Sequence, residues 1–292
     1  MITGRKILLT GATGFLGSNI LKKVCTNNDV AIITRERSNL SRIEDVNGTF
    51  KNYILEQSGI DNIVRSFRPD VIIHCATDYG RKAVPQMQVI EANLILPLKL
   101  IQAGCQAGLQ MFINTDTFLD KGISHYSLSK KQFIEWFRTY EKEMLCVNMV
   151  LEHFYGPLDD KTKFVSFIID ELLGNAKEIP LTPGTQKRNF IFIDDVVSAF
   201  EHILLHDFKY PSGFFDFFIA SEQTISIKEL VLKLQSFCAN HQTILNFGAL
   251  PFRANEIMDS SVDISAMKQL GWYPKTSLDE GLAYTIEQEK TK

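Results

Sequence analysis

The chain has 292 residues, of which 45% are hydrophobic and 22% are charged, and its formal net charge is −3 at pH 7. This length can bury a full core, and the composition is typical of a globular protein rather than a disordered chain. The small negative charge excludes a broad electrostatic attraction to nucleic acid or anionic lipid, and no stretch approaches the roughly 20 uninterrupted apolar residues of a membrane span.

The five cysteines are odd in number, lie far apart and form no C-x-x-C pair. We therefore expect neither a metal site nor a disulfide framework. The first residues, MITGRKILLTG, contain only a short apolar run, so we expect no signal peptide and place the protein in the reducing cytoplasm.

Short apolar runs alternate with helical patterns through the first half of the chain. The runs are nearly continuous in apolar residues, as expected of parallel strands that are covered on both faces. We predict strands over residues 6–10, 29–35, 52–55, 69–76, 111–115 and 145–151. The longest helical patterns cover residues 85–107 and 126–143. This alternation predicts an α/β fold with a Rossmann-type, doubly wound parallel sheet.

The regular alternation loosens after about residue 156. The later pattern predicts helices over residues 162–174, from Asp194 onward, over 226–240 and at the C-terminus, with strands over 189–193 and 214–220. We therefore expect a dinucleotide-binding domain over residues 1–156, to which residues 188–221 contribute a strand and a helix. A smaller, interleaved α/β substrate-binding part would comprise residues 157–187 and 222–292, and a cleft between the two is the expected ligand site.

Three glycines follow the first predicted strand, in the stretch LLTGATGFLG over residues 8–17. Gly11 permits a tight turn, Gly14 lets the backbone approach a pyrophosphate, and Gly17 lets the following helix pack closely on the strand. The helix N-terminus then offers free N–H groups to the anion. We predict a dinucleotide site that also includes the neighbouring residues Thr13, Phe15 and Leu16.

The end of the second predicted strand indicates how the ribose is recognised. An NAD site usually has Asp or Glu there, to bind the 2′-hydroxyl. This chain has Thr34, followed by Arg35 and Arg37. Guanidinium groups without a carboxylate suit a 2′-phosphate, which favours NADP(H). The alternative is NAD(H), with Glu36 turned inward to the ribose and the arginines solvated.

Tyr126 and Lys130 are spaced i and i+4 in HYSLSKKQF, which places the phenol and the ammonium on one face of a helix. A positive charge near a phenol lowers its pKa, so we expect Tyr126 to exchange a proton near neutral pH. Thr115 ends the fifth predicted strand, where ligands bind in such sheets, and is placed to hydrogen-bond a substrate carbonyl.

These motifs resemble the extended short-chain dehydrogenase/reductase family, which includes nucleotide-sugar epimerases, dehydratases and ketoreductases. The resemblance covers nearly the whole chain and is carried by TGATGFLG, NTDTF and YSLSK. Further similar segments are HCAT (74–77), FYGP (154–157), RNFIFIDDV (188–196) and LGWYPKTSLDEGL (270–282).

The resemblance implies a role for each matched residue. Tyr126 would be the proton donor, Lys130 would tune it and hold the nicotinamide ribose, and Thr115 would bind the reacting oxygen. The cofactor would also contact Cys75, Ala76, Thr77 and Asn93. The implied substrate contacts are Tyr79, Arg81, Asp116, Thr117, His153, Arg188 and Arg253.

Some of these substrate contacts have simpler alternatives. Arg188 and Arg253 fall where the family clamps the substrate diphosphate, yet either could be a surface arginine. His153 stands where family members carry Asn, and could contact the substrate or be a satisfied buried histidine. Tyr79 and Arg81 lie in ATDYGR (76–81), which resembles the ketoreductases of 4-keto-6-deoxy sugars.

Departures from the family pattern narrow the expected reaction. The sugar-nucleotide 4,6-dehydratases carry T-D-E where this chain has Thr115-Asp116-Thr117, so the glutamate that removes the C5 proton is missing. We therefore predict an enzyme, an NADPH-dependent reductase of the C4 keto group of a CDP- or dTDP-linked deoxyhexose in deoxysugar and O-antigen biosynthesis. The alternatives are an NAD-dependent nucleotide-sugar 4-epimerase and a non-catalytic NADP-sensing regulator.

The two long predicted helices raise the question of a homodimer. Family members often dimerise through the helices at residues 85–107 and 126–143, which then form a four-helix bundle. The apolar content of these helices suits packing on their own sheet equally well. The sequence leaves open the oligomeric state, the nucleotide base, the hexose and the C4 configuration.

Overall fold

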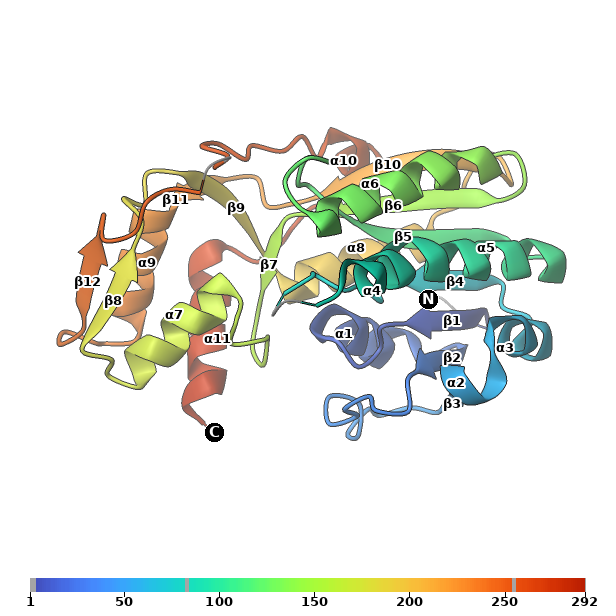
Figure 1. The fold of residues 1–292 in the computed structure, drawn as a ribbon, viewed down its shortest axis with the longest axis horizontal. Helices are drawn as coiled ribbons and strands as arrows, with labels where there is room; N and C mark the ends of the chain where they lie inside the picture. Colours follow the sequence, from blue (N-terminus) through green and yellow to red (C-terminus); the bar gives the residue numbers. More distant parts are fainter. Residues whose placement is uncertain (1–3, 82–83, 254–255, 292) are drawn as a thin grey trace. The chain divides into compact units, whose positions relative to one another are not determined.

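The computed structural model describes residues 4–81, 84–253 and 256–291 (Figure 1). The chain forms two compact units. The first comprises Met1–Leu151 and Val197–Phe217, and the second comprises Glu152–Val196 and Phe218–Lys292. The helix α8 (Ile193–Leu205) therefore begins in the second unit and continues in the first.

The first unit is built on a seven-stranded sheet in the order β10-β6-β5-β4-β1-β2-β3. The strands are β1 (Lys6–Thr10), β2 (Asp29–Thr34), β3 (Phe50–Ile54), β4 (Val71–His74), β5 (Met111–Thr117), β6 (Leu145–Leu151) and β10 (Gly213–Ile219). The pairings of β1 with β2 and β4, of β2 with β3, of β4 with β5 and of β5 with β6 are all parallel. The strand order reverses direction at β1, and ligands bind at this point in such sheets. The predicted Rossmann-type fold is confirmed.

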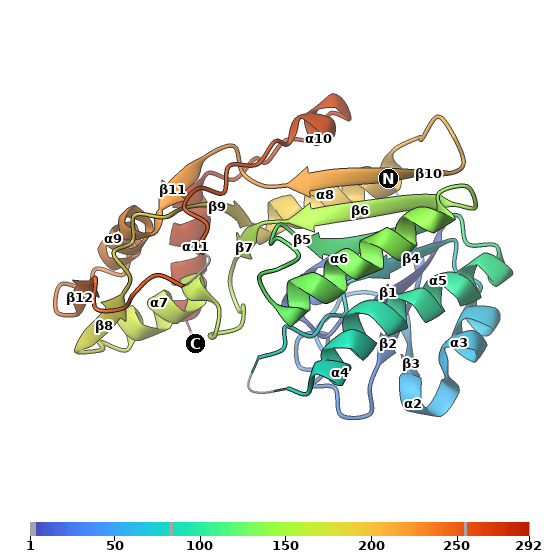
Figure 2. The same cartoon turned by 45° about the horizontal axis from the view of Figure 1, so that its top comes forward.

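Helices cover both faces of this sheet, which explains the continuous apolar runs of its strands. They are α1 (Phe15–Val24), α2 (Leu55–Ser58), α3 (Ile60–Phe67), α4 (Gln86–Ile90), α5 (Leu96–Ala107) and α6 (His125–Phe137), with a short 3-10 turn at Arg138–Tyr140. Figure 2 shows α4, α5 and α6 side by side on one face. There Leu8, Ile72 and Phe112 of the sheet pack against Leu100, Ile101, Phe133 and Phe137 in one buried core.

The predicted long helix over residues 85–107 is interrupted by a π-helical turn at Glu91–Ile95. The N–H of Leu96 bonds to the carbonyl of Glu91, five residues earlier. Pro97 follows directly and has no N–H to donate to the carbonyl four residues before it, which disfavours a regular α-helical ladder here. The wider turn contains Asn93, whose side chain is fully buried.

The second unit contains two small sheets. One has the order β11-β9-β7 and the other pairs β12 with β8. The strands are β7 (His153–Tyr155), β8 (Glu178–Leu181), β9 (Lys187–Phe192), β11 (Thr224–Ser226) and β12 (Ile244–Phe247), and the helices are α7 (Phe164–Leu173), α9 (Ile227–Phe237), α10 (Ser265–Gln269) and α11 (Leu278–Lys290). Within residues 188–221, the strand β10 joins the seven-stranded sheet and α8 continues into the first unit from Val197. The strand β9 lies in the second unit, where it pairs with β7 and β11.

Within the described residues, no helix is long and apolar enough to cross a membrane.

Candidate active site

The turn after β1 can be built only with glycine at two of its three glycine positions. Gly11 has φ = +72°, and a Cβ there would lie 2.5 Å from the amide nitrogen of Ala76 and 2.6 Å from the carbonyl carbon of Cys75. A Cβ on Gly17 would overlap the carbonyl oxygen of Gly11. The turn therefore packs directly against the segment that follows β4. The helix α1 packs equally closely against the turn.

The start of α1 is suited to an anion. Gly14 is extended, with φ = −81° and ψ = 170°, and caps α1 without a side-chain hydrogen bond. The first turn of α1 carries no acidic residue, while Phe15 and Leu16 bury their side chains beneath it. Thr13 is half-buried beside them. The uncapped N–H groups and the positive end of the helix dipole fit the pyrophosphate of a dinucleotide.

The end of β2 presents one buried hydroxyl and an exposed basic loop. The Thr34 hydroxyl donates to the side-chain oxygen of Asn52 at 2.9 Å. Arg35 and Arg37 are exposed, and neither forms an ion pair with any other described residue. Glu36 is also exposed, and its carboxylate accepts a long 3.5 Å hydrogen bond from Gln57.

Asn93 holds the segment that follows β4. Its side-chain oxygen accepts from the hydroxyl of Thr77 and the N–H of Asp78, both at 2.9 Å, and its amide donates to Ser129 of α6 at 3.0 Å. These bonds occupy its amide, and the direct contact of Asn93 with the cofactor stays a prediction. Asn93 fixes the turn Cys75–Thr77, which lies against Gly11, and this turn remains a predicted cofactor contact.

The helix α6 carries Tyr126 and Lys130 at a start fixed by its own capping residues. Ser124 and Ser127 form a reciprocal capping box that begins the helix at His125. This capping signal, which was not predicted, is readable in the sequence S-H-Y-S over residues 124–127. It places Tyr126 in the first turn and Lys130 one turn later, and Lys130 is 2% exposed.

Lys130 is a buried cation whose Nζ has no hydrogen-bond partner among the described residues. Burial lowers the pKa of Lys130 to about 8, although Asp116 and Cys75 act in the opposite direction. A buried ammonium without a partner is costly, so the site favours a ligand that supplies oxygen acceptors. The hydroxyls of a nicotinamide ribose are such acceptors, and together with the glycine turn this orphaned Nζ fits the predicted dinucleotide.

The expected lowering of the Tyr126 pKa is wrong. Burial raises the pKa of Tyr126 well above its usual value, and the nearby Tyr79 and Asp116 raise it further. A hydrogen bond from Thr117 and the charge of Arg81 act in the lowering direction but are outweighed. In this environment the phenol keeps its proton at neutral pH.

Two threonines, Thr115 and Thr117, lie at the end of β5, and their hydroxyls make different interactions. The Thr115 hydroxyl donates to the backbone carbonyl of His74 at 3.0 Å. Thr117, two residues on and therefore on the same face of the strand, acts to lower the pKa of Tyr126, and its hydroxyl oxygen accepts from the N–H of Leu119 at 3.3 Å. The substrate contact that the family resemblance implies for Thr117 stays a prediction.

Asp116 lies on the opposite face of β5, where its carboxylate is already occupied. It accepts from Nζ of Lys131 at 2.8 Å and from the side chain of Asn148 at 3.3 Å, and it is 4% exposed. Its other oxygen accepts from the N–H of Thr117 at 2.7 Å. This carboxylate supports the end of β5, and its contact with substrate stays a prediction.

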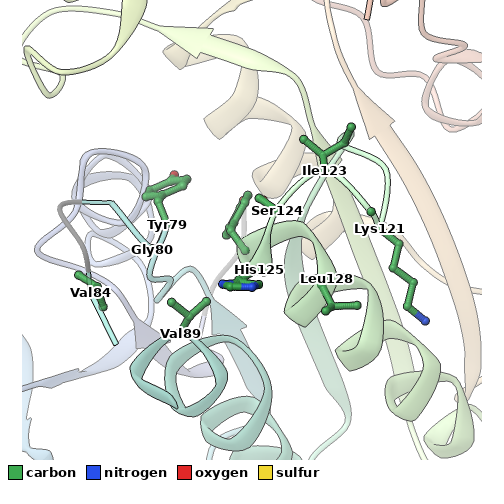
Figure 3. Close-up of a pocket in the computed structure, with 11 residues that line it drawn as sticks. Tyr79, Gly80, Val84, Val89, Lys121, Ile123, Ser124, His125 and Leu128 are labelled. Atoms are coloured by element: carbon green, nitrogen blue, oxygen red, sulfur yellow. The ribbon is translucent and has the colours of Figure 1, made fainter. Parts of the chain in front are cut away.

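A cavity of about 780 Å³ opens beside the phenol (Figure 3). Tyr79 approaches it from the segment after β4, and its ring centroid lies 4.9 Å from that of Tyr126. The Arg81 guanidinium lies 5.1 Å from the Tyr79 ring centroid. The remaining walls combine polar and apolar residues, which are Gly80, Val84, Val89, Lys121, Gly122, Ile123, Ser124, His125 and Leu128.

The other predicted substrate contacts belong to the second unit. His153 is exposed, and its Nδ1 lies 2.7 Å from a carboxylate oxygen of the buried Glu152, so the alternative of a buried histidine is wrong. Arg188 is only 9% exposed and pairs with Glu256, so it is not a surface arginine. A substrate diphosphate would have to share or replace that carboxylate. Arg253 is exposed, and its substrate role stays a prediction.

Comparison with known proteins places this geometry in context. Residues 7–214 match the family described as the NAD-dependent epimerase/dehydratase family. The chain is 32% identical to CDP-abequose synthase of Salmonella muenchen over 98% of both chains, and 32% identical to that of Salmonella typhimurium over 97% of both. Among solved structures, a UDP-glucose 4-epimerase from Thermotoga maritima superposes with a TM-score of 0.84 at 20% identity, covering 98% of this chain and 99% of that one.

Proposed function

Since the chain belongs to the NAD-dependent epimerase/dehydratase family, we propose that it reduces the C4 keto group of a nucleotide-linked deoxyhexose with NADPH. The family membership and the relatives make the protein an NAD(P)-dependent oxidoreductase of the short-chain dehydrogenase/reductase type. The keto group, the direction of the reaction and the preference for NADPH belong to the proposal.

The observation that carries the proposal is that β5 ends in Thr115-Asp116-Thr117, with Thr117 at its last position. The resembling 4,6-dehydratases have a glutamate at this position, which removes a proton from carbon. A threonine hydroxyl is far too weak a base for that step, whereas it can support a phenol that donates its proton. The raised pKa of Tyr126 supports the same direction, because a protonated phenol is what a reductase requires.

The basic loop after β2 supports NADPH as the reductant. Arg35 and Arg37 are exposed without an ion-pair partner among the described residues, and Thr34 gives no carboxylate to bind a 2′-hydroxyl. Glu36, which the NAD alternative would turn toward the ribose, instead interacts with Gln57. A 2′-phosphate beside two guanidinium groups would gain charge-assisted hydrogen bonds.

The relatives support a CDP-linked substrate. Two proteins named CDP-abequose synthase are each 32% identical to this chain over almost its whole length. Their name places their product among CDP-linked sugars, so CDP is our first choice of nucleotide and dTDP the second. The product would then be a deoxysugar donor for surface polysaccharide such as O-antigen, made in the cytoplasm.

The reaction assigns one task to each residue near the phenol. When bound, the reduced nicotinamide supplies the hydride that reduces the C4 carbonyl carbon. As charge develops on the carbonyl oxygen, Tyr126 breaks its O–H bond and gives that oxygen the proton. Lys130, buried one helical turn away, stabilises the resulting phenolate and binds ribose hydroxyls through Nζ.

The test is a panel of nucleotide-linked 4-keto deoxyhexoses, each with NADPH and with NADH, followed by the absorbance of the reduced nicotinamide. We expect NADPH oxidation with at least one CDP- or dTDP-linked member. Failure with every member would contradict the reductase assignment. Purified protein that carries NAD and interconverts nucleotide sugars without net NADPH consumption would support a 4-epimerase instead.

A further inference from the structure

The face of the central sheet beneath α6 is largely apolar but carries one chain of buried polar side chains. Phe133 and Phe137 of α6 pack against Phe112 of β5, with ring centroids 6.2 and 5.3 Å from that of Phe112. Asn114 and Asp116, two and four residues further along β5, lie on the same face of the strand. Asp116 is 4% exposed, and a buried carboxylate is costly unless it is paired. Its partners therefore indicate what it contributes to the fold.

The first partner of Asp116 is Lys131, which comes from α6. Nζ of Lys131 donates to the Asp116 carboxylate at 2.8 Å and to the backbone carbonyl of Thr117 at 2.6 Å. The other Asp116 oxygen accepts from the Thr117 N–H at 2.7 Å. One ammonium group thus joins the last two residues of β5 to the helix residue that directly follows Lys130.

Asn148 of β6 extends this chain across the sheet. Its amide nitrogen, which carries two hydrogens, donates to Asp116 at 3.3 Å and to Asp216 of β10 at 2.8 Å. Its oxygen accepts from the Asn114 amide at 2.8 Å. Asp216 in turn forms an ion pair with Arg138, which directly follows α6. We call this set the polar ladder, and its members are Lys131, Asp116, Asn148, Asp216 and Arg138.

The polar ladder contacts the helical segment at two points that are about two turns apart. Lys131 and Arg138 are seven residues apart, which places both cations on one face of a helix with 3.6 residues per turn. The carboxylates that they contact belong to β5 and β10, and β6 lies between these strands in the sheet. Apolar packing is not directional, whereas ion pairs at two points oppose both sliding and rotation of the helix.

We infer that Lys131 is a positioning residue, which fixes α6 against the end of β5 and thereby sets the place of Tyr126 and Lys130. This inference rests on the proposed reduction and adds to it a residue that acts through the helix rather than on the substrate. Lys131 directly follows Lys130 in the sequence, whereas Arg138 secures the far end of the helix. The position of the pair matters because a displacement of about 1 Å can cost on the order of 10²-fold in rate.

Other contacts hold α6 without duplicating this one. The Asn93 amide donates to the Ser129 hydroxyl at 3.0 Å and ties the helix to the π-helical turn rather than to β5. Glu135 pairs with Lys121 from the loop before α6, and both side chains are exposed. Exposed ion pairs contribute little to stability. Loss of the Lys131 ammonium should therefore loosen the helix without detaching it, and the Glu135 pair offers a control.

Lys131→Met tests the inference, with Lys131→Arg as the variant that keeps the cation. We expect the methionine variant to lose about tenfold in kcat, which is within the loss that a displacement below 1 Å can cause. KM for the sugar and for NADPH should stay within about threefold, because the Lys131 ammonium is bonded to β5. The arginine variant should regain most of the activity, since a guanidinium also offers several donors. Glu135→Gln should keep the natural kcat.

Two results would overturn the inference. One is a folded methionine variant whose kcat, measured well below its melting temperature, stays within about twofold of the natural value. The other is an arginine variant that is no more active than the methionine variant, since the cation would then have no part in the effect. Lys131→Met leaves Asp116 unpaired, so it could fail to fold. Lys131→Met combined with Asp116→Asn removes both charges, and a natural kcat in that folded variant would equally overturn the inference.

Hydrogen exchange of the α6 amides separates this inference from the proposed function, because it needs no turnover. We expect the amides of residues 129–137 to exchange about tenfold faster in Lys131→Met than in Lys131→Arg or Glu135→Gln, since a helix with fewer tertiary contacts opens more often. If exchange differs in this way while the natural protein reduces no keto sugar, the role of Lys131 in holding α6 stands and the proposed reaction fails. Equal exchange in all three variants would reject the inference.

Discussion

The glycine turn after β1 and the Tyr126–Lys130 pair on α6 meet the demands of a ligand in opposite ways. The turn achieves its shape because side chains are missing: a Cβ on Gly11 would lie 2.5 Å from the Ala76 nitrogen. The start of α6 instead buries large polar side chains whose interactions are incomplete. Nζ of Lys130 has no hydrogen-bond partner among the described residues, and the pKa of Tyr126 is raised by burial.

The glycine turn is therefore prepared for a ligand by its shape, whereas the Tyr126–Lys130 pair is prepared by its electrostatics. The turn is fully formed by backbone geometry and needs no ligand to be stable. The Tyr126–Lys130 pair is held by the fold in an unfavourable electrostatic state, which a ligand with oxygen acceptors would relieve. Substitutions in the turn should therefore affect folding and cofactor binding, whereas substitutions in the pair should affect chemistry while sparing or even increasing stability.

The largest expected effect is at the phenol. Tyr126→Phe should lower kcat for keto-sugar reduction by about 10³-fold, because it removes the proton donor and general acid catalysis contributes roughly 10²–10⁴-fold. The melting temperature should change little, since the ring still packs beside Tyr79. Steady-state kinetics check the loss of kcat, and thermal melts check the unchanged melting temperature. Full activity in this variant would refute the assignment of the donor and revive a non-catalytic role for the fold.

The turn offers a matched pair of substitutions. Gly11→Ala should destabilise the free protein by about 1–3 kcal/mol, because a positive φ and a close backbone contact are both violated. At Gly14 a Cβ would meet only the Gly11 oxygen at 3.3 Å, and the backbone is already extended. Gly14→Ala should therefore cost less, about 0.5–1 kcal/mol, mainly because alanine is a poorer N-cap residue than glycine.

Dinucleotide binding to the two glycine variants, Gly11→Ala and Gly14→Ala, is then measured by calorimetry. Gly14→Ala should weaken it although the fold is intact, because its methyl group points to where a pyrophosphate approaches the helix. Equal loss of stability in both alanine variants would contradict the assignment of Gly11 to folding and of Gly14 to dinucleotide binding.

The cost of burying Lys130 should be measurable. Its pKa is lowered from 10.5 to about 8, and this shift corresponds to about 3 kcal/mol of native-state destabilisation while the lysine is charged in both states. Lys130→Met should therefore be inactive but more stable than the natural protein at pH 7. Between pH 8 and 10.5 the unfolded chain binds more protons at this site than the native protein does. The natural protein therefore gains stability as pH rises, and the stability difference between it and Lys130→Met becomes smaller. Denaturant unfolding of both proteins across this pH range tests the predicted stability difference. A Lys130→Met variant that is less stable than the natural protein at pH 7 would contradict it.

The smallest expected effect concerns the cofactor preference. Arg35→Ala combined with Arg37→Ala should raise KM for NADPH about tenfold, the size expected for one lost charge-assisted contact, and leave KM for NADH nearly unchanged. Lys51→Ala, which removes an exposed charge from the neighbouring strand β3, is the control for general electrostatics. An equal rise for both cofactors would indicate that the arginines do not recognise a 2′-phosphate.

Much of the fold could be predicted because it depends on local patterns. The strands of the central sheet are buried on both faces, so their apolar runs are visible without any tertiary information, and β1 and β6 have the predicted bounds. The glycine turn follows from three positions in one short segment. The π-helical turn at Glu91–Ile95 was not predicted, although Pro97 is visible in the sequence. The turn also contains Asn93, whose side chain hydrogen-bonds to Thr77, Asp78 and Ser129, and these partners are distant in the sequence.

The candidate site was predictable only in part. The spacing of Tyr126 and Lys130 identifies a pair on one helix face, but it does not give the pKa of either group, because burial outweighs the neighbouring charges at both. Asp116 and Thr117 are adjacent in the sequence, yet the Asp116 carboxylate bonds Lys131 while the Thr117 hydroxyl accepts from the Leu119 N–H.

The sequence by itself determined the family, the parallel sheet and the position of the dinucleotide turn, since backbone geometry and apolar burial leave a local record in the residues. Only the tertiary structure decided that the Thr115 hydroxyl bonds the His74 carbonyl, that the side chains of Asn93 and Asp116 are bonded within the scaffold, and that Lys130 Nζ has no hydrogen-bond partner among the described residues. Those outcomes depend on which groups meet across strands and helices, and on how much water burial removes from each of them.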